Sequence, residues 1–257
     1  MSQSDPIGTT VGTPVGTTFS QPIRAITTML LVCALVGAGA LLRWQHPVLG
    51  AVAPNRFIPV AETTGLIVPI GAWVLDQACA QAAAWQTLRP GLRLAVNVSV
   101  RQFEQDDVPA LVRGALQRHR LDPGCLEIEV TESLFGNTLA LRHMLVELRT
   151  LGVHIALDDF GTGYSSLGQL KTLPLDRLKI DRCFVADLTP DSDSHAIVQT
   201  IVTLAHSLKL ALTAEGVENE VQRQILLGLG AGDAQGWLFH RAMPTDQFEV
   251  LLRGLAR

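Results

Sequence analysis

Short apolar segments alternate with amphipathic segments along most of this chain, and this alternation limits the folds that it can adopt. Aliphatic and β-branched residues fill the middle of six predicted strands, which also carry polar or acidic residues: 92–100, 125–131, 153–159, 176–181, 210–216 and 234–239. Apolar residues recur at helical spacing in five predicted helices: 70–85, 108–119, 139–151, 196–208 and 218–229. Repeated strand–helix units predict parallel strands covered by helices.

The number of these units favours an α/β barrel. Two further strands are expected before residue 45, which brings the total near eight in a chain of 257 residues. Eight strand–helix units in roughly 250 residues are typical of a (β/α)8 TIM-like barrel. A doubly wound open sheet is the alternative, but no Gly-x-Gly-x-x-Gly motif follows an early strand.

The composition is that of a folded protein with a substantial core, because 47% of the residues are hydrophobic and 17% are charged. The net charge of -4 argues against a nucleic acid polymer as partner, since such a partner is held by basic residues. The four cysteines include no pair at zinc-site spacing and need no disulfide framework. We therefore expect a cytoplasmic protein.

The N-terminal quarter differs from the rest because no Asp or Glu occurs between Asp5 and Glu62. Residues 1–18 are rich in Gly, Thr and Ser and are predicted to be a disordered leader before a domain over 19–257, whose part 19–38 is atypical. Residues 29–42 form an uncharged apolar run that is shorter than the roughly 20 residues of a spanning helix. We expect a buried strand there; membrane association through 29–42 is the alternative.

Polar side chains follow the predicted strands at the point where each one ends. They are Asn97, Glu129, Asp158 with Asp159, Lys179 with Asp181, Glu215 and Gln235. Each alone is typical of a helix cap or a surface charge, but in a parallel barrel all of these ends meet at one mouth. Several carboxylates at one mouth repel one another unless cations lie between them, and carboxylate and amide oxygens suit Mg²⁺ or Mn²⁺. The sequence therefore predicts a metal site at this mouth.

The segment DDFGTGYSS over 158–166 begins with two adjacent acids. Consecutive strand residues face opposite ways, so the chain must turn at once for both carboxylates to reach one site. Gly161 and Gly163 are expected to permit that turn. One carboxylate that bridges two ions, beside a second that holds one of them, is the arrangement of a two-metal site. A plain glycine-rich turn is the alternative.

Eight motifs together resemble the EAL domain family, bacterial phosphodiesterases that open cyclic di-GMP to linear pGpG. They are ALLRWQHP (40–47), RFIPVAETTGLI (56–67), NVSVRQF (97–103), EVTES (129–133), DDFGTGYSSL (158–167), LKIDRCFV (178–185), AEGVE (214–218) and QGWLF (235–239). The resemblance covers about 34–253, with a fainter match at 21–23. It implies a barrel whose first strand is antiparallel to the others, and a homodimer.

The same resemblance assigns a role to each candidate residue. The ligands of the first metal would be Asn97, Glu129 and Asp158, and Asp158 would bridge to a second metal that Asp159 helps to hold. The other roles are water activation by Lys179 and Glu215, support by Gln235, anchoring of the 158–166 loop by Glu132, and substrate binding by Gln21 and Arg43.

The chain departs from the family at the position that gives the family its name. Glu-Ala-Leu is replaced by Gly39-Ala40-Leu41, so a carboxylate ligand of the first metal is missing and that metal is expected to bind more weakly. Three interpretations remain open. The chain is a phosphodiesterase with impaired turnover, a degenerate receptor that binds cyclic di-GMP and signals, or a product whose first 38 residues are a truncated or frame-shifted start.

Overall fold

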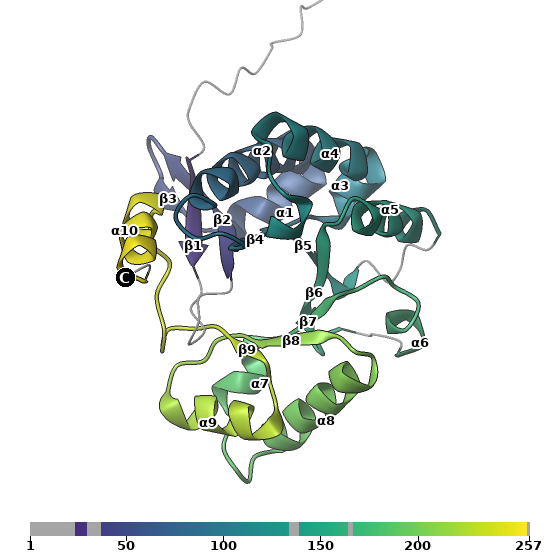
Figure 1. The fold of residues 1–257 in the computed structure, drawn as a ribbon, viewed down its shortest axis with the longest axis vertical. Helices are drawn as coiled ribbons and strands as arrows, with labels where there is room; N and C mark the ends of the chain where they lie inside the picture. Colours follow the sequence, from purple (N-terminus) through teal and green to yellow (C-terminus); the bar gives the residue numbers. More distant parts are fainter. Residues whose placement is uncertain (1–23, 30–36, 134–138, 164–166, 256–257) are drawn as a thin grey trace, which may run out of the picture.

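A computed structural model describes residues 24–29, 37–133, 139–163 and 167–255 of the chain. Eight strands follow one another in a single curled sheet (Figure 1): β1 (Arg24–Met29), β2 (Gly37–His46), β4 (Arg93–Asn97), β5 (Leu126–Thr131), β6 (His154–Phe160), β7 (Arg177–Ile180), β8 (Ala211–Ala214) and β9 (Asp233–Ala234). A ninth strand, β3 (Gly50–Val52), pairs only with β2. The order confirms the predicted α/β barrel-like fold.

The first strand runs against the rest, as the sequence predicted. β1 pairs antiparallel with β2, whereas β2 and every later neighbour on the path to β9 pair in parallel. In the described part of the chain, β1 and β9 form the two ends of the strand order. β1 and β2 are the two strands expected before residue 45; the apolar run 29–42 contains the last residue of β1, Met29, and the start of β2 from Gly37 onward. The predicted leader, 1–18, lies outside the described residues.

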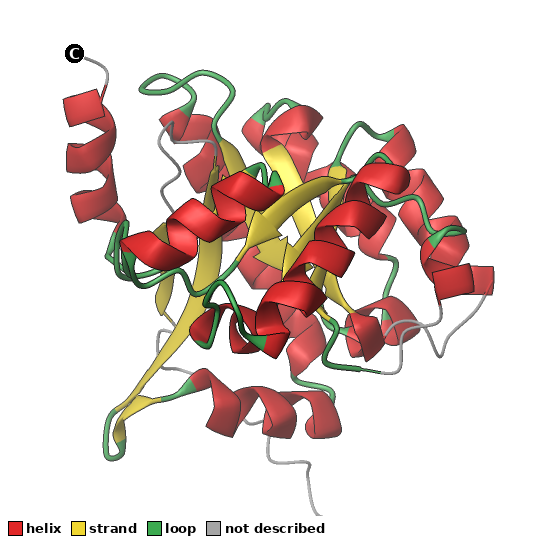
Figure 2. Cartoon of the chain, turned by 90° about the horizontal axis from the view of Figure 1, so that it is seen from below, coloured by secondary structure: helices red, strands yellow, loops and turns green. Residues whose placement is uncertain are grey.

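Helices cover the outside of the sheet, and Figure 2 shows the strands enclosed by them. They are α1 (Pro54–Thr64), α2 (Ile67–Trp85), α3 (Val100–Gln105), α4 (Val108–His119), α5 (Leu139–Thr150), α6 (Leu167–Leu170), α7 (Arg182–Ala186), α8 (Asp193–Ser207), α9 (Glu220–Leu229) and α10 (Thr245–Leu255). The five predicted helices correspond to α2, α4, α5, α8 and α9. Sequence periodicity missed α10, whose Phe248 is buried edge-on against Trp85 of α2.

Successive residues of a strand face opposite sides of the curled sheet, as β4 illustrates. In β4, Leu94 and Val96 are buried in the hydrophobic core, whereas Arg93, Ala95 and Asn97 line an interior cavity. This alternation follows from the two-residue period of a strand. The interior therefore contains polar side chains, and an apolar core lies between the sheet and the helices.

The predicted last strand, 234–239, is shorter than expected. β9 consists of Asp233 and Ala234, and the residues after them leave the sheet. Gly236 lies so close to the backbone of Val217 that a Cβ atom would stand 2.1 Å from the Val217 carbonyl oxygen. Only glycine fits this close approach, which turns the chain away from the sheet directly after Gln235.

Within the described ranges, no single helix is both long and apolar enough to cross a membrane. Helices α1 and α2 reach that length and composition only as a pair, which is bent by 120°.

Candidate metal and catalytic site

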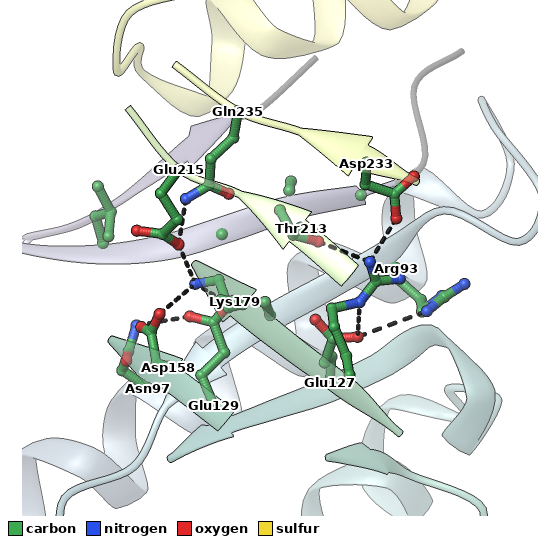
Figure 3. Close-up of a pocket in the computed structure, with 16 residues that line it drawn as sticks. Arg93, Asn97, Glu127, Glu129, Asp158, Lys179, Thr213, Glu215, Asp233 and Gln235 are labelled. Carbon is green, nitrogen blue, oxygen red and sulfur yellow. Dashed lines mark hydrogen bonds and ion pairs between the residues drawn. The ribbon is translucent and has the colours of Figure 1, made fainter. Parts of the chain in front are cut away.

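Polar side chains from neighbouring strands line one cavity of about 310 Å³ inside the curled sheet (Figure 3). Six residues predicted from the strand ends are among them: Asn97, Glu129, Asp158, Lys179, Glu215 and Gln235. They come from or directly follow β4, β5, β6, β7, β8 and β9, in that order. The structure therefore brings together six of the eight side chains that the sequence placed at a common mouth; Asp159 and Asp181 are not among the lining residues.

Lys179 lies at the centre of this set. Its Nζ atom is 2.7 Å from Glu129 Oε1, 3.0 Å from Asp158 Oδ1 and 2.6 Å from Glu215 Oε1. Burial alone would lower the pKa of Lys179, but the three carboxylates outweigh burial and raise it well above its usual value. The side chain is 6% exposed, so a permanent positive charge is held among three acids with little access to water.

Hydrogen bonds orient the acids around the lysine. Asn97 Nδ2 donates to Glu129 Oε2 over 2.9 Å, which leaves the amide oxygen of Asn97 available to another ligand. Gln235 Nε2 donates to Glu215 Oε1. Burial raises the pKa of Glu215 to about 7, and burial likewise raises the pKa of Glu129. Glu215 therefore changes its protonation state near neutral pH, which suits a proton acceptor.

A β-bulge brings the two adjacent acids of the DDFGTGYSS segment to the same side. Leu157 and Phe160 of β6 pair with Leu178 and Ile180 of β7, so Asp158 and Asp159 together oppose the single residue Lys179. Asp159 itself adopts a left-handed conformation, with φ of +54°. The turn begins at Asp159 and includes Gly161, one of the two glycines expected to permit it, whose φ is +97°.

The bulge creates a group of oxygen atoms that could hold a cation. One carboxylate oxygen each from Asp158, Asp159 and Glu215 lies within 4.8 Å of the others. Burial first, and then the carboxylates of Asp158 and Asp181, raise the pKa of Asp159 to about 6. Acids crowded in this way gain from a divalent ion between them, and an all-oxygen donor set suits Mg²⁺ or Mn²⁺. The donor set therefore fits the predicted metal.

Glu132 holds the start of the segment after β6. Its Oε1 accepts a hydrogen bond from the backbone N–H of Gly161 over 2.7 Å. A Cβ atom on Gly163 would stand 2.4 Å from Glu132 Oε2, so glycine at 163 allows the backbone to approach this carboxylate. Glu132 thus contacts the segment for which it was predicted to be an anchor.

The wall of the cavity that β2 forms carries no polar side chain. Gly37, Gly39 and Leu41 alternate along β2 and line the cavity, and Gly39 pairs with Ala95 of β4. Arg43 is not among the lining residues, and its Nη1 donates to the carbonyl of Leu42. Gln21, the other predicted substrate contact, lies outside the described residues.

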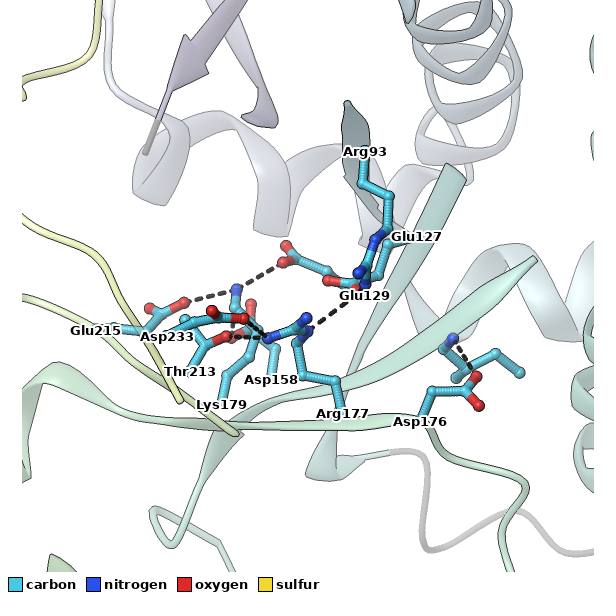
Figure 4. Close-up of polar contacts among 11 residues, drawn as sticks. Arg93, Glu127, Glu129, Asp158, Asp176, Arg177, Lys179, Thr213, Glu215 and Asp233 are labelled. Carbon is cyan, nitrogen blue, oxygen red and sulfur yellow. Dashed lines mark hydrogen bonds and ion pairs between the residues drawn. The ribbon is translucent and has the colours of Figure 1, made fainter. Parts of the chain in front are cut away.

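Sequence reasoning missed a second polar layer, one step further toward the N-terminal ends of the strands (Figure 4). Arg177 lies at its centre, contacting Glu127 over 3.1 Å, Thr213 over 2.7 Å and Asp233. Burial alone would lower the pKa of Arg177, but Glu127 and Asp233 raise it. Members of this layer stand two residues before members of the first: Glu127 before Glu129, Arg177 before Lys179, Thr213 before Glu215 and Asp233 before Gln235. Residues two apart in a strand share a face, so a polar residue two positions before each strand-end residue was the sequence signal for this layer.

Comparison with known proteins places this geometry in a family. The family model described as EAL domain matches residues 21–242. The chain is 48% identical over 215 residues to the bifunctional diguanylate cyclase/cyclic di-GMP phosphodiesterase MucR of Pseudomonas aeruginosa, covering 83% of this chain and 31% of MucR. It is 43% identical over 219 residues to the signaling protein YkoW of Bacillus subtilis, covering 85% of this chain and 27% of YkoW. The chain thus spans about a third or less of the length of these relatives.

A solved structure supports the same assignment. The MucR phosphodiesterase in complex with c-di-GMP superposes with a TM-score of 0.84 at 44% sequence identity. The match covers 88% of this chain and 94% of that chain. The family match, the identity to MucR and the shared fold agree with the predicted resemblance. This chain belongs to the EAL domain family.

Proposed function

We propose that this chain is an EAL-type cyclic di-GMP phosphodiesterase domain that hydrolyses its substrate to linear pGpG with Mg²⁺ or Mn²⁺, and that Gly39 slows its turnover. The observation that carries the proposal is the convergence in one cavity of the acids around Lys179, namely Glu129, Asp158 and Glu215. The MucR phosphodiesterase, which shares this fold, was solved in complex with c-di-GMP.

The oxygen donors on β4, β5 and β6 are the proposed metal ligands. Asn97, Glu129 and Asp158 would hold the first metal, and Asp158 and Asp159 would hold the second, beside Glu215. Divalent ions bound there would activate water and stabilise the negative charge that develops on a phosphodiester during in-line hydrolysis. No histidine or cysteine is needed for such a site.

Lys179 and Glu215 are the proposed proton-handling pair. Glu215, with a pKa raised to about 7, can accept a proton from an attacking water at Oε1 or Oε2 near neutral pH. Lys179 Nζ, 2.6 Å from Glu215 Oε1, favours the ionised form of that acid and supplies a positive charge beside the reacting phosphate. Gln235 fixes the orientation of Glu215 by donating to the same oxygen.

Gly39 is the proposed reason for slow turnover. It lines the cavity on β2 without a side chain, so water must replace a carboxylate in the first metal site, and water carries no negative charge. β2 pairs with both β1 and β4, so the strand that carries Gly39 is part of the sheet. Arg43 and Gln21 are the proposed substrate contacts.

A receptor that binds cyclic di-GMP without hydrolysing it is the second candidate, and Gly39 is the observation that favours it. The two candidates predict different results when purified protein is incubated with cyclic di-GMP and Mg²⁺ or Mn²⁺. The phosphodiesterase releases pGpG, detected by chromatography, and a Glu215→Gln variant does not. If no pGpG forms above the level of that variant, calorimetric titration of cyclic di-GMP in the presence of Ca²⁺ tests the receptor, and absence of heat contradicts it.

The extent and setting of the domain are also proposals. We propose a domain over 19–257, with 1–18 as a leader, and a homodimer located in the cytoplasm. Light scattering of the purified chain measures the mass of the assembly, and a mass of 27.7 kDa, that of a single chain, would contradict the dimer.

A further inference from the structure

A carboxylate outside the cavity is hydrogen-bonded to the segment that carries Asn97. Glu62 lies in α1, and its Oε1 accepts a hydrogen bond of 2.6 Å from the hydroxyl of Ser99. Ser99 stands two residues after Asn97, directly beyond the end of β4. Glu62 and Ser99 are 37 residues apart in the chain, and both side chains are partly buried.

Local helix physics does not explain why an acid occupies this position. Glu62 lies in the last turn of α1, where the negative end of the helix dipole disfavours a carboxylate. In the described part of the chain, no Lys, Arg or His forms an ion pair with it. A residue that violates a local rule is expected to be retained for a contact elsewhere, and the contact seen here is the one with Ser99.

Hydrogen bonds also hold the two residues that follow Asn97, Val98 and Ser99. Val98 N–H donates to the carbonyl of Glu129 over 3.0 Å. Ser99 N–H donates to Gln102 Oε1 over 3.1 Å, which completes a capping box at the start of α3. The Ser99 hydroxyl accepts from the N–H of Arg101 while donating to Glu62. The Glu62 bond is thus the link between this capped turn and α1.

We propose that Glu62 is a positioning residue that, through Ser99, holds Asn97 in place to bind metal. The inference rests on the proposed function, because it takes Asn97 as a metal ligand. A hydrogen bond to an ionised acceptor is stronger than one between neutral groups, which suits a contact that must fix a loop. With Gly39 in β2 offering no carboxylate, the first metal depends on the exact placement of the ligands that remain, Asn97 among them.

The test measures Mn²⁺ affinity by electron paramagnetic resonance on the full chain. Glu62→Ala and Ser99→Ala are each expected to raise the Kd for Mn²⁺ about tenfold, the usual scale for a partner that orients a ligand. Glu62→Gln keeps an oxygen acceptor and is expected to bind within about threefold of the original chain. The double variant is expected to be no weaker than either single variant, because both remove the same bond.

Thr63→Ala is the matched control, since its exposed hydroxyl bonds only to the Pro59 carbonyl of its own helix. This variant is expected to bind Mn²⁺ as the original chain does. A folded Glu62→Ala protein with unchanged Mn²⁺ affinity would overturn the inference, and so would additive losses in the double variant. Thermal unfolding of each variant separates a loss of placement from a loss of folding.

Hydrogen exchange separates this inference from the proposed metal site. Amides over 97–102 are expected to exchange about tenfold faster in Glu62→Ala than in Thr63→Ala, because a bond to a charged acceptor is lost. If the original chain binds no Mn²⁺, the proposed metal site fails, and the exchange data still decide whether Glu62 holds the segment. Equal exchange in the two variants would overturn the inference, whatever the metal result.

Discussion

Lys179 and Glu215 form a buried ion pair, with Nζ 2.6 Å from Oε1, inside a cavity lined by further acids. The same lysine contacts Glu129 and Asp158, so one positive charge lies among three carboxylates. A bound divalent ion would also offset the negative charge of these carboxylates. The stability of the metal-free domain and its affinity for metal are therefore linked through Lys179.

Lys179→Met is expected to destabilise the metal-free protein by about 3 kcal/mol at pH 8, because it leaves buried carboxylates without a partner. The loss should be smaller at pH 5, below the folded pKa of about 7 of Glu215, since the protonated acid needs no counter-charge. Urea denaturation at the two pH values measures this difference. An equal loss at both would show that Lys179 does not balance the acids.

Metal binding is expected to depend on pH through Asp159 and Glu215. Their folded pKa values, about 6 and about 7, exceed the usual values for carboxyl groups, so both are partly protonated at pH 6 and must lose protons to bind an ion. Affinity for Mn²⁺ should therefore fall as the pH drops from 8 to 6. Calorimetry in two buffers of different ionisation enthalpy counts the protons released when Mn²⁺ binds. If no more protons are released at pH 6 than at pH 8, Asp159 and Glu215 do not couple metal binding to pH.

The second polar layer predicts a contrast between two arginines. Arg177→Met removes a buried side chain that contacts Glu127, Thr213 and Asp233, and should lower the free energy of unfolding by about 3–5 kcal/mol. Arg93→Met is the control, because that side chain is 30% exposed and lies 3.5 Å from Glu127. It should cost no more than about 1 kcal/mol. Similar losses in both variants would contradict a central role for Arg177.

The polar residues at the strand ends could be predicted from the sequence because parallel strands bring their C-terminal ends together. Asn97, Glu129 and Lys179 each close a short apolar segment, and the structure places all three in one cavity. Apolar residues at helical spacing likewise predicted five of the helices, α2, α4, α5, α8 and α9.

Other features depended on contacts that no local pattern records. The bulge at Asp158 and Asp159 follows from pairing with β7, and the short β9 follows from the approach of Gly236 to Val217. The layer around Arg177 was missed because only the polar residues at the strand ends were predicted to converge. The contact of Glu62 with Ser99 spans 37 residues, a distance over which periodicity carries no information.

Hydrolysis of cyclic di-GMP by Gly39→Glu, compared with the original chain, tests the central claim most directly. The carboxylate at 39 would face the same cavity as Asn97 and Glu129, and its return to an otherwise complete site should raise kcat at least about 100-fold with Mg²⁺ or Mn²⁺. Gly39→Ala, which adds a Cβ atom without a carboxylate, should leave the slow rate unchanged. Formation of pGpG by folded Gly39→Glu protein at the rate of the alanine variant would contradict the account.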